Sequence, residues 1–397
     1  MFKPLYSGTI VSPQGFLAGA VTAKIKKGEE LDLAILYSRV SCTAAGVFTT
    51  NQIKSAPIIL SQKHLLKGRA QAIVANSGCA NACLGEQGIA DAREIAKLVA
   101  TKMDLAPEDV LVASTGVIGV PLPMDKIRAG IPRIRLTKEG GHDFAWAIMT
   151  TDTTPKEIAM EVDMKGNKFT IGAVAKGAGM IHPDLATMLC FIATDASVNV
   201  QFLKEALKKA AAVSFNMLSV DGDTSPSDCV LLLANGLAGN KADFSNGEAF
   251  QKALNEVCIY LAKSIAQDGE GATKLIQVTV EGAKYETEAR QAARIIVSSP
   301  LVKVAVYGSD PNWGRIVTAL GRSGAEVVEE ILDVYLNDVP VMKQGCAAYF
   351  DKEKMRASLQ GNNVFIKLNL NLGDGKATAW GCDLSPEYVR INSAYTT

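Results

Sequence analysis

The spacing of hydrophobic positions switches repeatedly along the chain between the periods of helices and of strands. Residues 86–103 and 249–266 carry apolar side chains at helical spacing, which predicts two long amphipathic helices. Residues 189–193 form an uninterrupted apolar run, which is typical of a buried strand. Glycines interrupt the pattern, for example at 176–180. This mixture of strands, helices and glycine-rich connections predicts an α/β or α+β protein.

The same criteria predict further elements on both sides of a soft boundary near residue 273. The further helices are expected at 201–215 and 287–297, and the further strands at 110–113, 169–175, 229–233, 275–280 and 302–306. A new strand–helix–strand sequence begins near residue 273, although no Pro- or Ser-rich linker marks the division. We therefore expect a main domain over 1–272, which would carry the chemistry, and a C-terminal α+β domain over 273–397.

Composition removes several classes of function from consideration. The chain has 397 residues, 48% of them hydrophobic, and its 41 basic and 41 acidic residues cancel. A balanced chain has no electrostatic footprint for nucleic acid or an anionic membrane surface. Neither a signal peptide nor an apolar stretch of membrane-spanning length is visible. Eight scattered cysteines in a chain of this length indicate reduced thiols and a cytoplasmic protein.

One threonine could supply both a nucleophile and the general base that activates it. Thr187 lies between the glycine-rich run at 176–180 and the predicted strand 189–193. If its hydroxyl attacked the carbonyl of Ala186 and water opened the resulting ester, Thr187 would gain a free α-amine. Such an amine titrates at about 7.7–8.0 and is well suited to act as the general base for the hydroxyl. The alternative is a β-branched packing residue at the head of a strand, the more common role of such a threonine.

The scarcity of histidine makes this arrangement attractive. The chain has only His64, His142 and His182, so a triad that depends on histidine has few candidates. Two other patterns invite a metal and are better explained without one. Cys79 and Cys83 lack further ligands at metal-binding spacing, so we expect buried thiols. The 221–223 segment resembles part of a calcium loop but lacks the remaining ligands, so we expect a turn held by aspartate side chains.

The run at 186–189 and seven other motifs, spread over the whole chain, carry a resemblance to a known family. The run Ala186-Thr187-Met188-Leu189 resembles the self-cleavage point of the ornithine acetyltransferase (glutamate N-acetyltransferase) family of arginine biosynthesis. Other segments that resemble the family lie at 75–83, 114–119, 150–153, 219–224, 268–274, 310–316 and 392–397. The resemblance implies a self-processing fold of layered sheets and helices. It also implies a cut between Ala186 and Thr187 that gives chains 1–186 and 187–397.

The resemblance assigns roles to individual positions. It places the nucleophile at Thr187 and the oxyanion hole at Thr115 and Gly116, where a hydroxyl and a backbone N–H can point at one oxygen. Taken alone, Thr115-Gly116 is equally well explained as a turn. The family's substrate contacts fall on Thr153, Lys176, Thr187, Glu270, Asn392 and Thr397. Lys176 is the candidate partner of a substrate carboxylate, and Glu270 that of the ornithine ammonium.

The implied reaction transfers an acetyl group from N2-acetylornithine to glutamate through an acetyl-threonine intermediate, and releases ornithine and N-acetylglutamate. One amide is exchanged for another, so no cofactor and no metal are expected. Some family members also accept acetyl-CoA as a co-substrate, and the residues do not decide whether this chain does. The resemblance further implies a heterotetramer of two α and two β chains. Two alternatives stay open: a self-cleaving aminopeptidase or amidohydrolase of the same fold, and an uncut binding protein for acidic amino acids.

Overall fold

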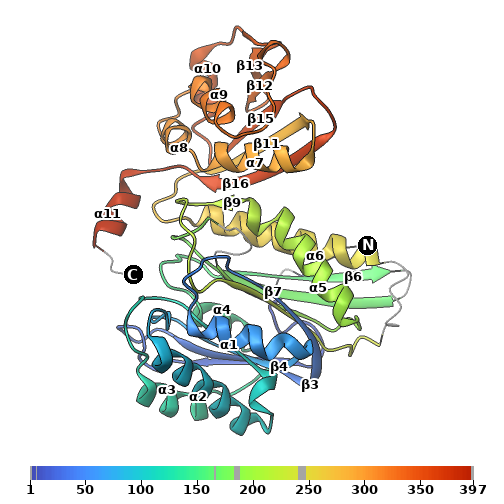
Figure 1. The fold of residues 1–397 in the computed structure, drawn as a ribbon, viewed down its shortest axis with the longest axis vertical. Helices are drawn as coiled ribbons and strands as arrows, with labels where there is room; N and C mark the ends of the chain where they lie inside the picture. Colours follow the sequence, from blue (N-terminus) through green and yellow to red (C-terminus); the bar gives the residue numbers. More distant parts are fainter. Residues whose placement is uncertain (1, 6, 165–166, 183–187, 240–246, 395–397) are drawn as a thin grey trace.

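The computed structural model describes residues 2–5, 7–164, 167–182, 188–239 and 247–394. Two mixed β-sheets and their covering helices organise this part of the chain (Figure 1). Short 3-10 turns lie at 65–67, 107–109, 131–133, 215–217 and 329–331. None of the described helices is long and apolar enough to cross a membrane. The combination confirms the predicted α/β class.

The larger sheet runs in the order β1-β6-β7-β8-β10-β3-β4-β5, and β2 pairs with β3 off this path. Its strands are β1 (Phe2–Leu5), β6 (Lys156–Met164), β7 (Asn167–Lys176), β8 (Leu189–Thr194), β10 (Cys229–Ala234), β3 (Leu33–Phe48), β4 (Arg69–Asn76), β5 (Val110–Ser114) and β2 (Phe16–Val21). The central pair β8 and β10 is parallel, and Leu189 lies opposite Cys229. The chain therefore enters both strands from the same edge of the sheet.

The smaller sheet runs in the order β14-β13-β12-β15-β11-β16-β9. Its strands are β14 (Cys346–Ala347), β13 (Val339–Lys343), β12 (Asp333–Leu336), β15 (Asn363–Asn369), β11 (Leu275–Ala283), β16 (Gly375–Cys382) and β9 (Leu218–Ser219). β9 is contributed by a segment well before residue 273, and it pairs in parallel with β16 through Leu218 and Trp380. The division into domains at residue 273 stays a prediction.

Helices cover both faces of the larger sheet and part of the smaller one (Figure 1). They are α1 (Ala56–His64), α2 (Gly85–Met103), α3 (Met124–Gly130), α4 (Gly141–Ala147), α5 (Val200–Val213), α6 (Gly247–Gln267), α7 (Glu286–Val297), α8 (Pro300–Tyr307), α9 (Trp313–Gly321), α10 (Lys352–Ser358) and α11 (Pro386–Ala394). Helix α6 contacts β6 and β7 of the larger sheet and β16 of the smaller one, so it joins the two layers.

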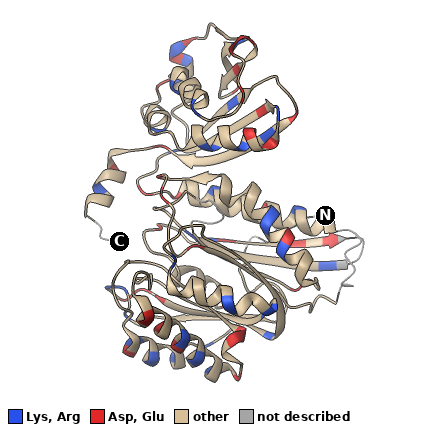
Figure 2. Cartoon of the chain, viewed as in Figure 1, with Lys and Arg blue, Asp and Glu red and all other residues tan. Residues whose placement is uncertain are grey.

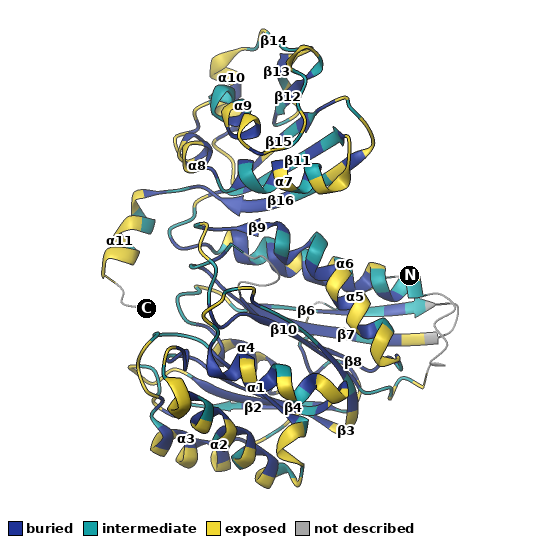
Figure 3. Cartoon of the chain, in the orientation of Figure 1, coloured by how far each residue is buried: buried dark blue, intermediate teal, exposed yellow. Residues whose placement is uncertain are grey.

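Every residue of β8 and β10 is buried, because helices pack on both sides of this pair (Figure 3). Alternate side chains point to opposite faces of a strand. Cys190 and Ile192 accordingly join the core that contains α5 and α6, whereas Leu189 and Phe191 join the core on the face of α4. Charged residues of both signs lie on helices α2, α3 and α5, among other elements (Figure 2). Burial on both faces explains the uninterrupted apolar run at 189–193.

The predicted elements are confirmed with one exception, and their ends differ by a few residues at most. The predicted strand at 302–306 is wrong, because these residues belong to helix α8. Val302 and Val306, four residues apart, are buried, while Leu301 and Val304 are 57% and 43% exposed. That is a helical period, and Pro300 occupies the first turn, where proline is tolerated. A five-residue segment, mostly apolar but with Lys303 inside it, was too short to separate strand from helix.

Candidate active site

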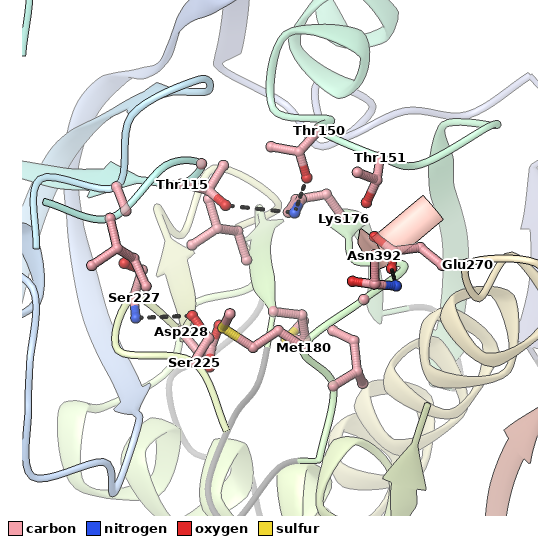
Figure 4. A pocket seen from close by; sticks show the side chains of 17 residues that line it. Thr115, Thr150, Thr151, Lys176, Met180, Ser225, Ser227, Asp228, Glu270 and Asn392 are labelled. Carbon is pink, nitrogen blue, oxygen red and sulfur yellow. Dashed lines mark hydrogen bonds between the residues drawn. The ribbon is translucent and has the colours of Figure 1, made fainter. Parts of the chain in front are cut away.

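A cavity lies at the edge of the larger sheet where β8 and β10 begin and where β5 and β7 end (Figure 4). Five of the residues expected to form the site line this cavity: Thr115, Gly116, Lys176, Glu270 and Asn392. They come from four separate parts of the chain, namely the turn after β5, the end of β7, the loop after α6, and helix α11. The structure therefore brings together side chains that are up to 277 positions apart in the sequence.

Three further expectations concern residues outside the described part of the chain: Ala186, Thr187 and Thr397. Met188, which directly follows Thr187, lines the cavity together with Leu189. Thr153 does not line it. Its side chain and its backbone N–H instead donate hydrogen bonds to the carboxylate of Asp268, and its neighbours Thr150 and Thr151 line the cavity.

The turn at Thr115-Gly116 is locked against the segment that follows β4. The Thr115 N–H donates to the carbonyl oxygen of Asn76 at 3.0 Å, and the Val117 N–H donates to that of Gly78 at 3.3 Å. Gly116 has a φ of +125°, and a Cβ there would lie 2.4 Å from the Gly78 carbonyl carbon. Among the described residues, no acceptor receives the Gly116 N–H. The backbone is thus held with a donor available at the cavity, as an oxyanion hole requires.

Lys176 is buried at the end of β7 and donates to hydroxyl groups in the cavity wall. Its Nζ lies 2.6 Å from Thr150 Oγ1 and 3.5 Å from Thr115 Oγ1. Burial lowers the pKa of the Lys176 ammonium group, and the negative charge of Asp152, 3.9 Å away, acts in the opposite direction. A buried cation beside the oxyanion turn is suited to hold a substrate carboxylate.

Lys176 belongs to a network of buried charged side chains. The Asp152 side chain is fully buried, and its carboxylate accepts hydrogen bonds from Lys156 Nζ at 2.7 Å and from the Gly177 N–H at 2.6 Å. Lys156 Nζ also contacts Asp268 at 2.5 Å. Burial alone would raise the pKa of Asp152, but Lys176, Lys156 and these hydrogen bonds outweigh it and lower the pKa to about 2. Asp152 is therefore ionised at neutral pH.

Glu270 and Asn392 form the opposite wall. The Asn392 amide of α11 donates to Glu270 Oε2 at 2.7 Å, and the Glu270 N–H donates to the Ala178 carbonyl oxygen at 2.9 Å. Gly179 lies against this carboxylate, because a Cβ there would come within 2.4 Å of its atoms. In Figure 4 the Glu270–Asn392 pair lies on one side of Lys176, and Asp228 lies on the other. The cavity thus presents a cation between two acidic groups.

Three residues of the cavity wall were not predicted from the sequence. Ser225, Ser227 and Asp228 line the cavity immediately before β10. No role for these three residues was predicted from the sequence. The missed signal was position: a polar segment directly precedes the central strand β10, and it lies at the same sheet edge as Met188, which directly precedes β8.

Two expectations about neighbouring motifs have definite outcomes. The turn at Asp221 is confirmed, because its carboxylate accepts the Asp223 N–H at 3.3 Å and also those of Met180 and Ile181 at 2.6 and 2.9 Å. The expectation of two buried thiols is half wrong: Cys79 is buried, but Cys83 is exposed because it lies in a surface turn before α2. Within the described residues, no group of His, Cys, Asp and Glu side chains is arranged to hold a metal ion.

The fold and cavity define a mixed α/β protein with a buried cation, a hydroxyl-bearing turn and two carboxyl groups at one sheet edge. The sequence profile of the ArgJ family matches residues 17–397, so this chain belongs to the ArgJ family. It is 55% identical, over 99% of its length and 98% of the relative's, to an arginine biosynthesis bifunctional protein ArgJ of Dehalococcoides mccartyi. It is 51% identical to the protein of that name in Symbiobacterium thermophilum, over 98% of this chain and 99% of the relative.

A solved structure agrees in fold. The crystal structure of arginine biosynthesis bifunctional protein argJ from Bacillus halodurans is 45% identical in sequence and superposes with a TM-score of 0.51. The match covers 52% of this chain and 98% of that chain.

The packing of the Thr115-Gly116 turn predicts that alanine substitutions at two glycines differ strongly in their effect on stability. Gly116→Ala places a Cβ against the Gly78 backbone and also strains a left-handed φ, so it should lower the free energy of unfolding by about 3 kcal/mol or more. Gly119→Ala is the control, because Gly119 also has a positive φ, +78°, but has no atom within 4 Å of the added Cβ. It should cost only about 1–2 kcal/mol. Urea unfolding of both variants measures this, and equal losses would contradict the packing argument.

The buried network predicts a pH-dependent contribution to stability. Asp152 has a depressed pKa in the folded protein, so its contribution is complete above the unfolded value of 3.8 and is lost as the pH falls through about 2. Asp152→Asn should therefore lower the free energy of unfolding by about 2 kcal/mol or more at neutral pH. The gap to wild type should stay constant down to about pH 5 and narrow below about pH 4. Urea unfolding across this pH range measures the difference in free energy of unfolding between variant and wild type. The control is Asp374→Asn, the same change at an exposed position. A difference that does not vary with pH would contradict the assignment.

Proposed function

We propose that this protein transfers an acetyl group from N2-acetylornithine to glutamate in arginine biosynthesis. The observation that carries the proposal is the 55% identity, over almost the full length of both chains, with an arginine biosynthesis bifunctional protein. The cavity is chemically consistent with this function, since Lys176, Glu270, Asn392 and the Thr115-Gly116 turn meet at one place. Both amino-acid substrates carry a carboxylate, and one carries a distal ammonium.

In the first half of the reaction, Thr187 Oγ attacks the acetyl carbonyl of N2-acetylornithine while the α-amine of Thr187 takes the hydroxyl proton. The Thr115 hydroxyl and the Gly116 N–H bind the oxyanion that forms. The Lys176 ammonium group lies 3.5 Å from Thr115 Oγ1 and favours negative charge there. The carbon–nitrogen bond then breaks, ornithine leaves, and an acetyl-threonine ester remains.

In the second half, the amine of glutamate attacks the ester and departs as N-acetylglutamate. Lys176 holds the α-carboxylate that both substrates share. The Glu270 carboxylate pairs with the ornithine ammonium, and the Asn392 amide, which offers both a donor and an acceptor, serves the side chain of either substrate. Thr151 lines the same cavity. Because one amide is exchanged for another, the cycle needs no cofactor and no metal.

The proposal includes self-cleavage between Ala186 and Thr187. The match to the solved Bacillus halodurans chain covers almost all of that chain but only 52% of the present one. The proposed fragment 187–397 is of similar size, since it makes up slightly more than half of the present chain. We infer that the two fragments stay together, because β7 and β8 are paired antiparallel on either side of the cut. We propose an assembly of two α and two β chains in the cytoplasm. Acetyl-CoA as a second acetyl donor is consistent with the word bifunctional in the relatives' names.

Mass spectrometry of the purified protein tests both the cut and the chemistry. Two fragments, 1–186 and 187–397, are expected, and the second should gain one acetyl group when N2-acetylornithine is added without glutamate. Adding glutamate should remove that group and yield N-acetylglutamate. A single uncut chain that gains no acetyl group would contradict the proposal. Release of acetate at the full rate without glutamate would favour a hydrolase instead.

The assignment of Glu270 predicts a selective loss. Glu270→Gln removes the negative charge that pairs with the ornithine ammonium, so the KM for N2-acetylornithine should rise about tenfold or more. The KM for glutamate should change little, because glutamate has no distal ammonium. Steady-state kinetics with each substrate varied in turn measures the difference. A rise in KM for glutamate with none for N2-acetylornithine would show that the assignment is wrong.

A further inference from the structure

Asp228 lies beside Met188, the residue that follows the proposed nucleophile in the sequence. It immediately precedes β10, and the Cys229 N–H donates to the Met188 carbonyl oxygen at 3.0 Å. On its other side, the Thr49 N–H donates to the Asp228 carbonyl oxygen at 3.0 Å. The backbone of Asp228 is therefore fixed between two strands, and its side chain lines the cavity directly beside Met188.

The Asp228 carboxyl group has unused hydrogen-bonding capacity. The residue is only 5% exposed, yet its Oδ2 has no hydrogen-bond partner among the described residues. A buried acceptor without a partner costs free energy, commonly about 1–3 kcal/mol. Such an atom in the wall of a cavity is explained when a ligand supplies the missing partner. Because Met188 directly follows the proposed nucleophile, we expect the reacting groups of the substrate to meet this part of the wall.

Burial favours the neutral form of Asp228 at rest. Burial raises the pKa of the Asp228 carboxyl group well above its usual range, whereas the charge of Lys176 on β7 and hydrogen bonds from Ser225 act in the opposite direction. The thiol of Cys229 is the other titratable group beside it, and burial raises the pKa of that thiol too. A neutral carboxyl group can donate a proton, and its carboxylate can take one back.

We propose that Asp228 exchanges a proton with the reacting nitrogen of the two substrates, while the α-amine of Thr187 serves only the hydroxyl oxygen. This inference rests on the proposed acetyl transfer. As the carbon–nitrogen bond of N2-acetylornithine breaks, the Asp228 carboxyl group gives its proton to that nitrogen, and ornithine leaves as a free amine. The resulting carboxylate takes a proton from the glutamate amine as the new carbon–nitrogen bond forms. The threonine oxygen regains its own proton from the α-ammonium, so every proton is returned.

The separate roles proposed for Asp228 and for the α-amine of Thr187 are tested with two acetyl donors that differ in the leaving group. An amide nitrogen needs a proton to leave, but the phenolate of p-nitrophenyl acetate does not. In Asp228→Asn, acetylation of fragment 187–397 by N2-acetylornithine should slow about 100-fold or more, while acetylation by p-nitrophenyl acetate should keep the wild-type rate. Deacetylation by glutamate should slow as well. Rapid mixing and mass spectrometry of the fragment follow all three rates.

The control is Asp223→Asn, the same chemical change at an exposed position five residues earlier that does not line the cavity. It should leave all three rates unchanged. Equal slowing of both donors in Asp228→Asn would overturn the inference and indicate a structural role, and so would an unchanged rate with N2-acetylornithine. Absence of transfer in the wild-type protein would instead reject the proposed function.

A second variant tests the inference even if Asp228→Asn fails to fold or to cleave. Ser225→Ala removes a hydrogen bond that lowers the pKa of Asp228, so that pKa should rise. Because Asp228 must be protonated in the first half-reaction, the high-pH limb of the rate with N2-acetylornithine should move to higher pH. The profile with p-nitrophenyl acetate should not move. A limb that stays in place, or one that moves equally with both donors, would overturn the inference.

Discussion

The buried network of Lys176, Asp152, Lys156 and Asp268 fixes the distance between the two walls of the cavity. Asp152 joins both lysines, and Lys156 reaches on to Asp268, two residues before Glu270. Each charge is removed from water and depends on its partners, so the loss of one member leaves others buried without compensation. The end of β7, which presents the cation, is thereby tied to the loop after α6, which presents the carboxylate.

The sheet supplies the second constraint. β8 and β10 run parallel and are buried on both faces, so the segments that precede them reach the same edge. Met188 and Asp228 are adjacent for this reason, although they are 40 residues apart in the sequence. Glycine permits the close approaches that remain: Gly116 against the Gly78 backbone and Gly179 against Glu270. Side chains at either position would displace a donor or an acceptor from the cavity.

The sequence predicted much of this arrangement, and the failures have physical causes. Long periodic segments such as α6 were correctly predicted, whereas the prediction for α8 was a strand because five residues are too few to show a helical period. Family resemblance placed Lys176, Glu270 and Asn392, which do share a cavity. It gave no reason to single out Asp228 or Asp152. Their importance arises from burial and from partners on other elements, which no local pattern of residues records.

In the proposed reaction, two substrates of opposite distal charge use one cavity, and the charges around that cavity suggest how the conflict is limited. The negative charge of Asp152 is satisfied by two lysines and two backbone donors behind Lys176, so it adds little repulsion toward a substrate carboxylate. In this proposal Glu270 faces the distal end of the substrate, and the Asn392 amide already donates to its carboxylate. When glutamate occupies the cavity, that amide can turn its N–H groups toward the substrate, whereas ornithine meets the Glu270 carboxylate directly. The buried Lys176 cation is common to both half-reactions. Discrimination between the two substrates therefore depends on whether the uncharged Asn392 amide binds Glu270 or the substrate.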